Sequence, residues 1–187
     1  MSFLPRLALA ALALALGMVA APAIAQVDGT PTALDAIMRT VSDDEQPVRA
    51  GYASLADAVV AQSLDDPLDG ETSCMAGAIY FESKGEPLTG QLAVADVILN
   101  RTRSGRFPRT ICAVVTQPGQ FSFVRDGRVP DIADCAYYRT AVAVARVAMA
   151  DAWQSPAAGA LFFHARRVSP GWHREHIATI GNQVFYR

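Results

Sequence analysis

The stretch from Cys74 to Arg103, CMAGAIYFESKGEPLTGQLAVADVILNRTR, places the strongest constraint on the fold, because it predicts two helices joined by a short charged corner. A helix over about residues 73–84, ended by Gly85, would place four residues on one face: Met75, Ala78, Ile79 and Glu82. Proline is tolerated in the first turn of a helix, so Pro87 suits the start of the second one. Residues 91–103 then form a broad apolar band, which is typical of a buried helix. We expect a helical hairpin in the core.

Glu82 interrupts the apolar face of the first helix. It also falls in the last turn, where the helix dipole disfavours a carboxylate. Burial and the dipole both raise a carboxyl pKa, and a carboxyl group that stays protonated near neutral pH can act as a general acid. The alternative is a structural carboxylate that reaches the edge of the face or caps a neighbouring loop.

Four stretches of the chain resemble the catalytic domain of the SleB-type cell-wall hydrolases, which include the spore-cortex-lytic enzymes and their Gram-negative relatives. They are AIYFESKGEPLTGQLAVADVILNR, FPRTICAVV, QPGQFSFVRDG and LFFHARRVSPGWHREHIATIGNQVFYR. The resemblance covers residues 74–187. It implies an enzyme that cleaves peptidoglycan, in which the glutamate of the first motif is the catalytic acid. Glu82 occupies that position.

The remaining elements predict an α+β fold. Residues 111–115 form a short apolar run, either strand or helix, and residues 136–153 an amphipathic helix. Residues 161–163 and 183–186 have the composition of short strands. A mostly helical domain with a short antiparallel sheet is the plan of lysozyme-like folds, and it agrees with the resemblance.

Residues 1–25 have the features of a signal peptide: a positive Arg6, an apolar run over residues 7–21, and Ala23-Ile24-Ala25 as the cleavage site. The apolar run is shorter than the ~20 residues that span a bilayer. An uncleaved membrane anchor is the alternative. We expect an exported, periplasmic protein without stable membrane insertion after cleavage.

Residues 26–70 are acidic and contain scattered Pro and Gly, so we expect a partly disordered tether before a catalytic domain over residues 71–187.

Charge limits the possible partners. The chain has 16 basic and 18 acidic residues, and loss of Arg6 with the signal peptide would bring the net charge near −3. This near-neutral, slightly acidic balance argues against nucleic acid as a partner, because phosphate binding needs a basic surface. Basic residues cluster over residues 101–109 and 166–174, and such clusters are usually solvent-facing, although they also suit an anionic polymer such as peptidoglycan. We expect peptidoglycan glycan strands as the partner and a monomeric protein.

Three cysteines enter an oxidising compartment if the chain is exported. An antiparallel hairpin would bring the end of the second helix near the start of the first, so we expect a disulfide between Cys74 and Cys112, with Cys135 left over. Three buried thiols are the alternative, because sequence does not fix connectivity.

His173 and His176 have a spacing that could chelate a metal on a helix. No further ligand motif accompanies them, so we expect surface histidines, no metal and no cofactor.

Cleavage of a glycosidic bond needs a proton donor and stabilisation of an oxocarbenium-like centre, and most glycoside hydrolases use two carboxylates. Candidates for the second are Glu86, Asp96 and Asp126, and none is strong. A lytic transglycosylase, an activity that the resembling family includes, needs only one carboxylate and yields a 1,6-anhydro-muramyl product. We therefore expect Glu82 as single general acid/base, cleavage between muramic acid and glucosamine, and Glu86 as a supporting carboxylate.

Expected glycan contacts are Tyr80, Gln120, Ser122 and His164. Core packing is the alternative for Tyr80, and a turn role for Gln120 and Ser122. The resembling family often has a histidine where this chain has Gln183. Three other functions stay open: a peptidoglycan-binding module without turnover, a muramidase with a second carboxylate, and an exported metalloenzyme.

Overall fold

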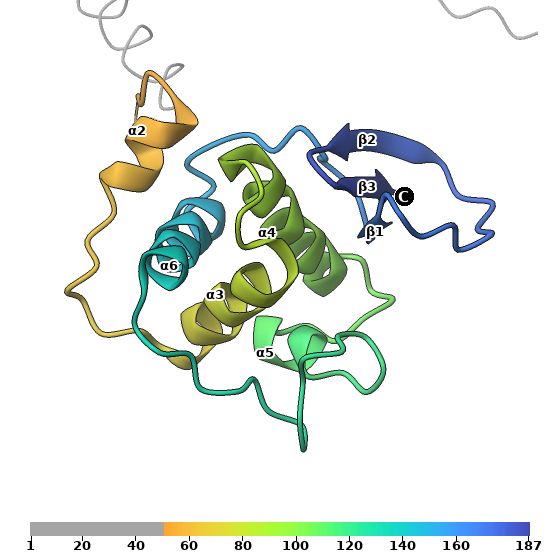
Figure 1. Ribbon diagram of the computed structural model, residues 1–187, viewed down its shortest axis with the longest axis horizontal. Helices are drawn as coiled ribbons and strands as arrows, with labels where there is room; N and C mark the ends of the chain where they lie inside the picture. Colours follow the sequence, from red (N-terminus) through yellow and green to blue (C-terminus); the bar gives the residue numbers. More distant parts are fainter. Residues whose placement is uncertain (1–50) are drawn as a thin grey trace, which may run out of the picture. The chain divides into compact units, whose positions relative to one another are not determined.

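The computed structural model of the protein describes residues 51–187 (Figure 1). The expected signal peptide and residues 26–50 of the expected tether lie outside the described residues. The described part contains α2 (Leu55–Val60), α3 (Gly70–Ser83), α4 (Leu88–Arg103), α5 (Ile111–Val115), α6 (Ala136–Met149), β1 (Phe162–Ala165), β2 (His176–Ile180) and β3 (Gln183–Tyr186). The α+β prediction, mostly helical with a small antiparallel sheet, is confirmed.

Helices α3 and α4 form the predicted hairpin. The Asp69 side chain caps α3 by accepting a hydrogen bond from the Thr72 backbone N–H at 2.6 Å. The helix ends at Ser83, and Gly85 follows with φ 85°, a left-handed conformation that glycine adopts without steric cost. Pro87 is the N-cap of α4, so it precedes the first turn of that helix rather than lying in it.

The main core lies between α3, α4 and α6, which pack against one another (Figure 1). Met75, Ala78 and Ile79 are fully buried on the face that the spacing predicted. Helix α6 ends at Met149, four residues before the expected end. None of the helices between residues 51 and 187 combines the length and the apolar character needed to cross a membrane.

Helix α2 lies within the stretch that we expected to be a tether. Leu55, Ala58 and Val59 follow the i, i+3, i+4 spacing of a single helix face. All three are buried in the same core as α3 and α4, and α2 packs against α6. The packed part of the chain therefore begins before residue 71, because the short apolar face of α2 packs against α6.

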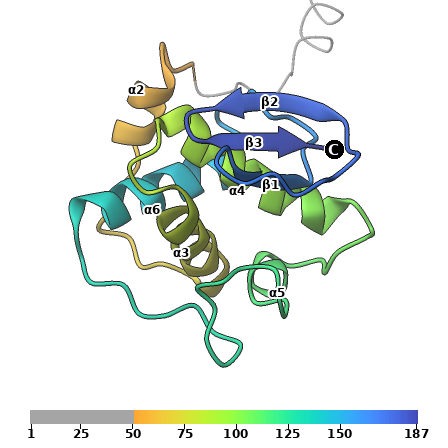
Figure 2. The same cartoon turned by 45° about the vertical axis from the view of Figure 1, so that its right-hand side comes forward.

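The sheet has the strand order β1-β3-β2, and both strand pairs are antiparallel. Its central strand places Phe185 in a second buried cluster with residues of α4 such as Val94 and Val97. Figure 2 shows the sheet lying over α4. Strand β2 was not expected from the sequence. It begins at His176, so His173 and His176 do not share a helix, and both are exposed, as expected for surface histidines.

Two contacts fix α5 against the start of α3. The Cys74–Cys112 disulfide joins Cα atoms 5.2 Å apart, which is the pairing expected from the hairpin, and Cys135 is a free thiol. Beside the disulfide, the Glu71 carboxylate accepts hydrogen bonds from the backbone N–H groups of Ile111 (2.6 Å) and Cys112 (3.3 Å). A carboxylate is favourable at this position because the first N–H groups of a helix have no partner within it.

Candidate active site

A cavity of about 370 Å³ opens where the end of α3 meets the sheet. Helices α3 and α4, the loop after α5, strands β1 and β3, and the residues directly after β1 all contribute to it. Its lining residues are Phe81, Glu82, Arg101, Gln120, Phe121, Ser122, Phe163, His164, Ala165, Arg167 and Gln183. The cavity therefore joins the expected acid to polar side chains and to aromatic rings.

Glu82 is half-buried in the last turn of α3. Burial raises the pKa of its carboxyl group, and the positive charge of Arg101 acts in the opposite direction with a smaller effect. Within residues 51–187 the carboxyl group forms no hydrogen bond or ion pair with another side chain. A carboxyl group with a raised pKa and no internal partner is suited to donate a proton to a ligand in the cavity.

Arg101 is buried, contrary to the expectation of a solvent-facing basic cluster. Only 5% of it is exposed. Its Nε donates to the Leu161 carbonyl at 2.8 Å, and its guanidinium lies 4.9 Å from the Phe107 ring centre. Burial lowers the pKa of Arg101 to about 10, with Glu82 acting in the opposite direction, so it stays protonated at neutral pH. Helical spacing could have indicated this burial from the sequence, because it places Arg101 on the same helix face as the apolar residues Val94 and Val97.

Gln183 occupies the position where the resemblance predicts a histidine. It is buried at the start of β3, and its Nε2 donates to the Glu82 backbone carbonyl at 2.8 Å. Carbonyls in the last turn of a helix lack partners within the helix, so this bond connects the end of α3 to the sheet. Sequence reasoning missed this contact, because the two residues are 101 positions apart.

Gln120, Ser122 and His164 line the cavity together with Glu82, as expected for residues of one site. Both nitrogens of the His164 ring have partners, the Ala165 carbonyl at 2.9 Å and the Tyr186 hydroxyl at 3.0 Å. The ring also stacks on Tyr186 with centres 5.3 Å apart. These contacts fix the orientation of the imidazole at the cavity wall.

Glu86 and Tyr80 do not line this cavity. The Glu86 carboxylate accepts hydrogen bonds from the backbone and side-chain nitrogens of Asn182, in the turn between β2 and β3. Tyr80 packs edge-on against Phe81 and Tyr138, and the Lys84 ammonium lies 4.8 Å from its ring centre. The structure thus gives Glu86 a role in holding the helical corner and gives Tyr80 a packing role.

Other carboxylates also lie outside the cavity. Asp96 is half-buried on α4, and burial raises its pKa, with a hydrogen bond from Ser155 and the charge of Arg103 opposing the shift. Asp126 is exposed in a turn, with φ 49°. Among the described residues that line the cavity, Glu82 is the only carboxylate. The same part of the chain contains no cluster of three or more histidine, cysteine or acidic residues arranged to hold a metal ion.

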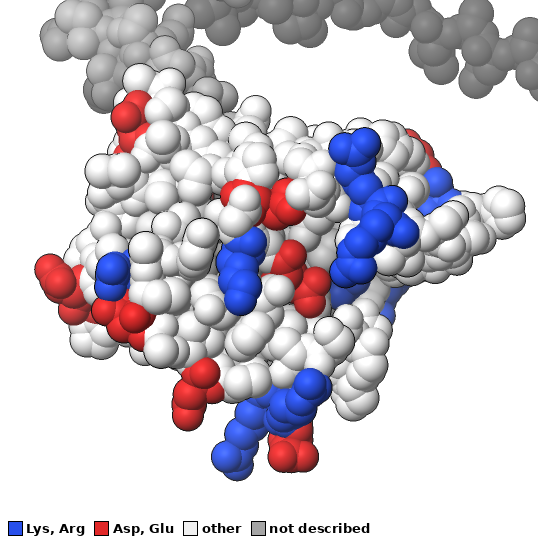
Figure 3. Space-filling model, viewed as in Figure 1, with Lys and Arg blue, Asp and Glu red and all other residues white. Residues whose placement is uncertain are grey.

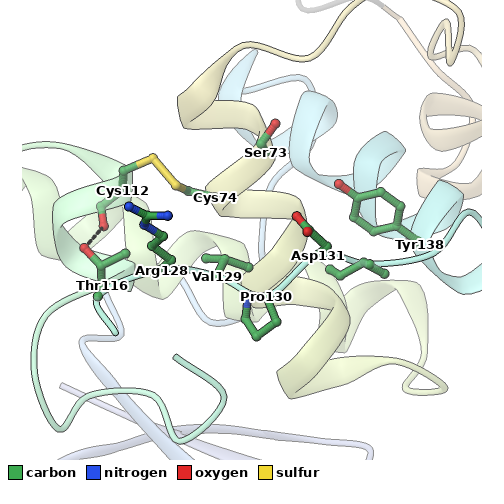
Figure 4. Close-up of a pocket in the computed structure, with 11 residues that line it drawn as sticks. Ser73, Cys74, Cys112, Thr116, Arg128, Val129, Pro130, Asp131 and Tyr138 are labelled. Carbon is green, nitrogen blue, oxygen red and sulfur yellow. Dashed lines mark hydrogen bonds between the residues drawn. A yellow bond between two sulfur atoms is a disulfide. The ribbon is translucent and has the colours of Figure 1, made fainter. Parts of the chain in front are cut away.

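A larger cavity of about 580 Å³ lies at the other end of α3, beside the disulfide (Figure 4). Its walls include Ser73 from α3, the residues 127–132 that precede α6, and Tyr138. Its carboxylate, Asp131, is exposed. Of the two cavities this one is larger, but only the smaller one contains a half-buried acid with a raised pKa. The Glu82 cavity is therefore the candidate active site.

The surface charge is mixed. Basic side chains gather over the region of the sheet in Figure 3, and acidic and basic side chains lie side by side across the middle of the same face. A continuous basic stripe, the usual footprint of nucleic-acid binding, is not seen on this face.

The fold and the site together define a small α+β domain with one half-buried acid in a polar and aromatic cavity. The chain belongs to the Cell Wall Hydrolase family, whose model matches residues 85–186. The resemblance to the SleB-type enzymes is confirmed by relatives and solved structures.

Two spore cortex-lytic enzymes illustrate the similarity. The enzyme of Halalkalibacterium halodurans is 38% identical over 122 residues, which is 63% of this chain and 34% of that protein. The enzyme of Bacillus subtilis is 34% identical over 134 residues, which is 69% of this chain and 41% of that protein. The chain thus spans well under half the length of these relatives.

Two solved structures share the fold. The catalytic domain of the germination-specific lytic transglycosylase SleB from Bacillus anthracis is 33% identical with a TM-score of 0.54, covering 67% of this chain and all of that domain. The catalytic domain of the Bacillus cereus SleB protein is 32% identical with a TM-score of 0.53, covering 68% of this chain and 99% of that domain.

Proposed function

We propose that the protein cleaves the glycan strands of peptidoglycan between muramic acid and glucosamine as a lytic transglycosylase, with Glu82 as single general acid/base. One observation carries this proposal: Glu82 is the only carboxylate among the described residues that line the cavity, and burial raises its pKa. The related B. anthracis domain is described as a lytic transglycosylase, which supports the same reaction class.

In the first step, protonated Glu82 gives its proton to the glycosidic oxygen, and the bond to C1 of muramic acid breaks through an oxocarbenium-like state. In the second step, the Glu82 carboxylate takes the proton of the sugar's own C6 hydroxyl, whose oxygen bonds to C1. The product is a 1,6-anhydro-muramyl end. Glu82 regains its proton and no water is consumed, so one carboxyl group serves both steps.

A muramidase reaction fits this site less well. Hydrolysis by two carboxylates needs them about 5–5.5 Å apart for retention or about 6.5–9.5 Å apart for inversion, on either side of the bond. The nearest acidic residue in sequence, Glu86, directs both carboxylate oxygens to Asn182. This observation favours the single-carboxylate reaction.

We assign the glycan contacts to Gln120, Ser122 and His164. Gln120 and Ser122 are exposed on the loop after α5 and lie in the same cavity as Glu82, so their polar groups can meet sugar hydroxyls. Phe121 and Phe163 supply the apolar wall, on which a sugar face can pack. The fixed imidazole of His164 supports orientation of the ligand rather than proton transfer.

We propose export to the periplasm through the segment of residues 1–25, action as a monomer, and no membrane insertion once that segment is removed. Membership of the Cell Wall Hydrolase family supports an extracytoplasmic substrate. The chain from residue 26 to the start of α2 would act as the tether, and the catalytic unit would include α2.

The test is incubation of the purified protein with isolated sacculi, followed by mass analysis of the soluble muropeptides. Anhydro ends are expected. Reducing ends would indicate a muramidase, and no release would indicate a binding module. Glu82→Gln is expected to lower release by about 10³-fold or more, because it removes the only proton donor assigned to the reaction. Glu175→Gln, at an exposed glutamate that does not line the cavity, is the matched control and should retain activity.

A further inference from the structure

Two buried polar atoms next to Glu82 have no hydrogen-bond partner. They are Nη1 of Arg101, a donor, and Oε1 of Gln183, an acceptor. Both side chains are more than nine-tenths buried, with 5% of Arg101 and 6% of Gln183 exposed, and both line the Glu82 cavity. Buried polar groups are normally paired, so two unpaired ones at a single site need an explanation.

The rest of each side chain is fixed. Nε of Arg101 donates to the Leu161 carbonyl, and its guanidinium carbon lies within 6 Å of the ring centres of Phe107, Phe121 and Phe162. Nε2 of Gln183 donates to the Glu82 carbonyl at 2.8 Å, so the remaining amide oxygen lies beside the same helix end. Packing and these bonds therefore hold one free donor and one free acceptor next to the reacting residue.

Glu82 alternates between two hydrogen-bonding states in the proposed reaction. Its protonated carboxyl group has an O–H that needs an acceptor, and its carboxylate needs a donor. The two unpaired atoms supply one of each. Their burial shields them from bulk water, so the partner that satisfies them has to come from the site itself.

We propose that Gln183 Oε1 and Arg101 Nη1 are alternate partners of the Glu82 carboxyl group, the first when it is protonated and the second when it is ionised. The inference rests on the proposed function for its role in turnover. Neither bond is formed in the structure, so each would require a rotation of the Glu82 side chain. The proton itself passes from Glu82 to the glycosidic oxygen and returns from the C6 hydroxyl, so Arg101 and Gln183 remain unchanged positioning residues.

This arrangement would serve both halves of the reaction. The acceptor of Gln183 holds the carboxyl O–H in place before transfer, and the guanidinium of Arg101 stabilises the carboxylate that forms once the proton has left. Three other titratable side chains line the cavity with Glu82: Arg101 from α4, His164 from β1 and Arg167 from the segment after β1. His164 and Arg167 are left intact in the variants that test the inference, so their influence is common to all of them.

The test is an NMR titration of the Glu82 side-chain carboxyl carbon in the purified chain, with the signal assigned by its absence in Glu82→Gln. Arg101→Met removes the partner of the ionised form and is expected to raise the titration midpoint by about one pH unit, a tenfold change in proton affinity. Gln183→Met removes the partner of the protonated form and is expected to lower it by about half a unit or more. The same apolar side chain is introduced at both positions. Loss of the Arg101 charge contributes to the upward shift, so the downward shift of Gln183→Met, which removes no charge, is the result that isolates a lost bond.

Two matched controls use the same replacement outside the cavity. Gln117 also has a buried amide oxygen without a partner, and Arg103 is the exposed basic residue of the same helical turn as Arg101. Gln117→Met and Arg103→Met should leave the Glu82 midpoint close to that of the unchanged protein. If Arg101→Met does not fold, Arg101→Gln, which retains an N–H for the Leu161 carbonyl, should shift the midpoint in the same direction.

Shifts of the same sign, or no shift in either cavity variant, would overturn the inference. A merely structural role predicts lost stability or activity without opposite midpoint shifts. The titration needs no turnover, so it decides this inference even if the sacculus assay shows no release and the proposed function fails. Where release is observed, the alkaline limb of its pH profile should move in the same two directions as the midpoints.

Discussion

Glu86 and Asn182 are joined by two hydrogen bonds, at 2.9 Å from the Asn182 backbone N–H and 3.1 Å from its side-chain amide. They connect the corner between α3 and α4 to the turn between β2 and β3. Gly181 makes this contact possible, because a Cβ atom at that position would overlap the Glu86 carboxylate. Since Gln183 follows directly and bonds the Glu82 carbonyl, the Glu86 contact helps to set the position of the candidate acid.

Glu86→Gln is expected to reduce the free energy of unfolding by about 1 kcal/mol, because an amide NH2 group, which is a donor, replaces one of the two oxygens that accept from Asn182. Glycan release should fall by about tenfold or less, since the effect on Glu82 is indirect. Urea denaturation and the sacculus assay measure the two effects. The exposed Glu175 pairs with Arg187 at 3.5 Å, and Glu175→Gln is a matched control that should change stability little. Complete loss of release with unchanged stability would instead make Glu86 a catalytic carboxylate.

The raised pKa of Glu82 makes folding stability depend on pH. The folded protein holds this proton more tightly than the unfolded chain, where a glutamate has its ordinary value of about 4.5. The contribution of Glu82 to stability is therefore most favourable below that value and declines as pH rises through the unfolded and then the folded pKa. Glu82→Gln does not titrate, so the variant should gain stability relative to the unchanged protein as pH rises from acid to neutral.

Urea denaturation of both proteins across this range measures the effect. Gln120→Ala, which removes a cavity-lining side chain that does not titrate, should differ from the unchanged protein by an amount independent of pH. A Glu82→Gln difference that is flat with pH would show that burial does not perturb the carboxyl group.

Local spacing predicted the helical hairpin and the place of Glu82, because the 3.6-residue period and the Gly85 break act over a few residues. It did not predict β2, whose residues pair with β3 and have no strong alternation of their own. Nor did it reveal the burial of Arg101 or the bond from Gln183 to Glu82, which depend on segments distant in sequence. Helical periodicity therefore located the candidate acid, whereas the residues around it depend on tertiary contacts.

Loss of the Cys74–Cys112 disulfide is expected to cost about 4 kcal/mol, because the bond closes a loop of 38 residues in the unfolded chain. The double variant Cys74→Ser/Cys112→Ser should show this loss by urea denaturation. A reducing agent should have the same effect on the unchanged protein and none on the double variant. Equal stability of oxidised and reduced protein would contradict the pairing.

Cys135 occupies the N-cap of α6 with an extended backbone, φ −154° and ψ 164°, but its side chain makes no capping bond. A serine hydroxyl at an N-cap accepts a bond from a backbone N–H near the helix start. Cys135→Ser is therefore expected to raise the free energy of unfolding by about 0.5–1 kcal/mol. Cys135→Ala, which cannot cap, is the control and should show no gain. Equal stability of the serine and alanine variants would exclude a capping contribution at this position.

Gly77 lets the segment before α6 lie directly on α3. A Cβ atom at this position would lie 2.5 Å from Cγ1 of Val129, which is closer than real contacts allow. Gly77→Ala should therefore lower the free energy of unfolding by about 1 kcal/mol, since the clash outweighs the gain in helix propensity. Val129→Ala removes the clashing methyl group, so the double variant should be more stable than the sum of the single effects predicts, by about 1 kcal/mol in a double-mutant cycle. Strictly additive effects would mean that the Val129 side chain does not pack on Gly77, and that the wall of the larger cavity is not fixed by this contact.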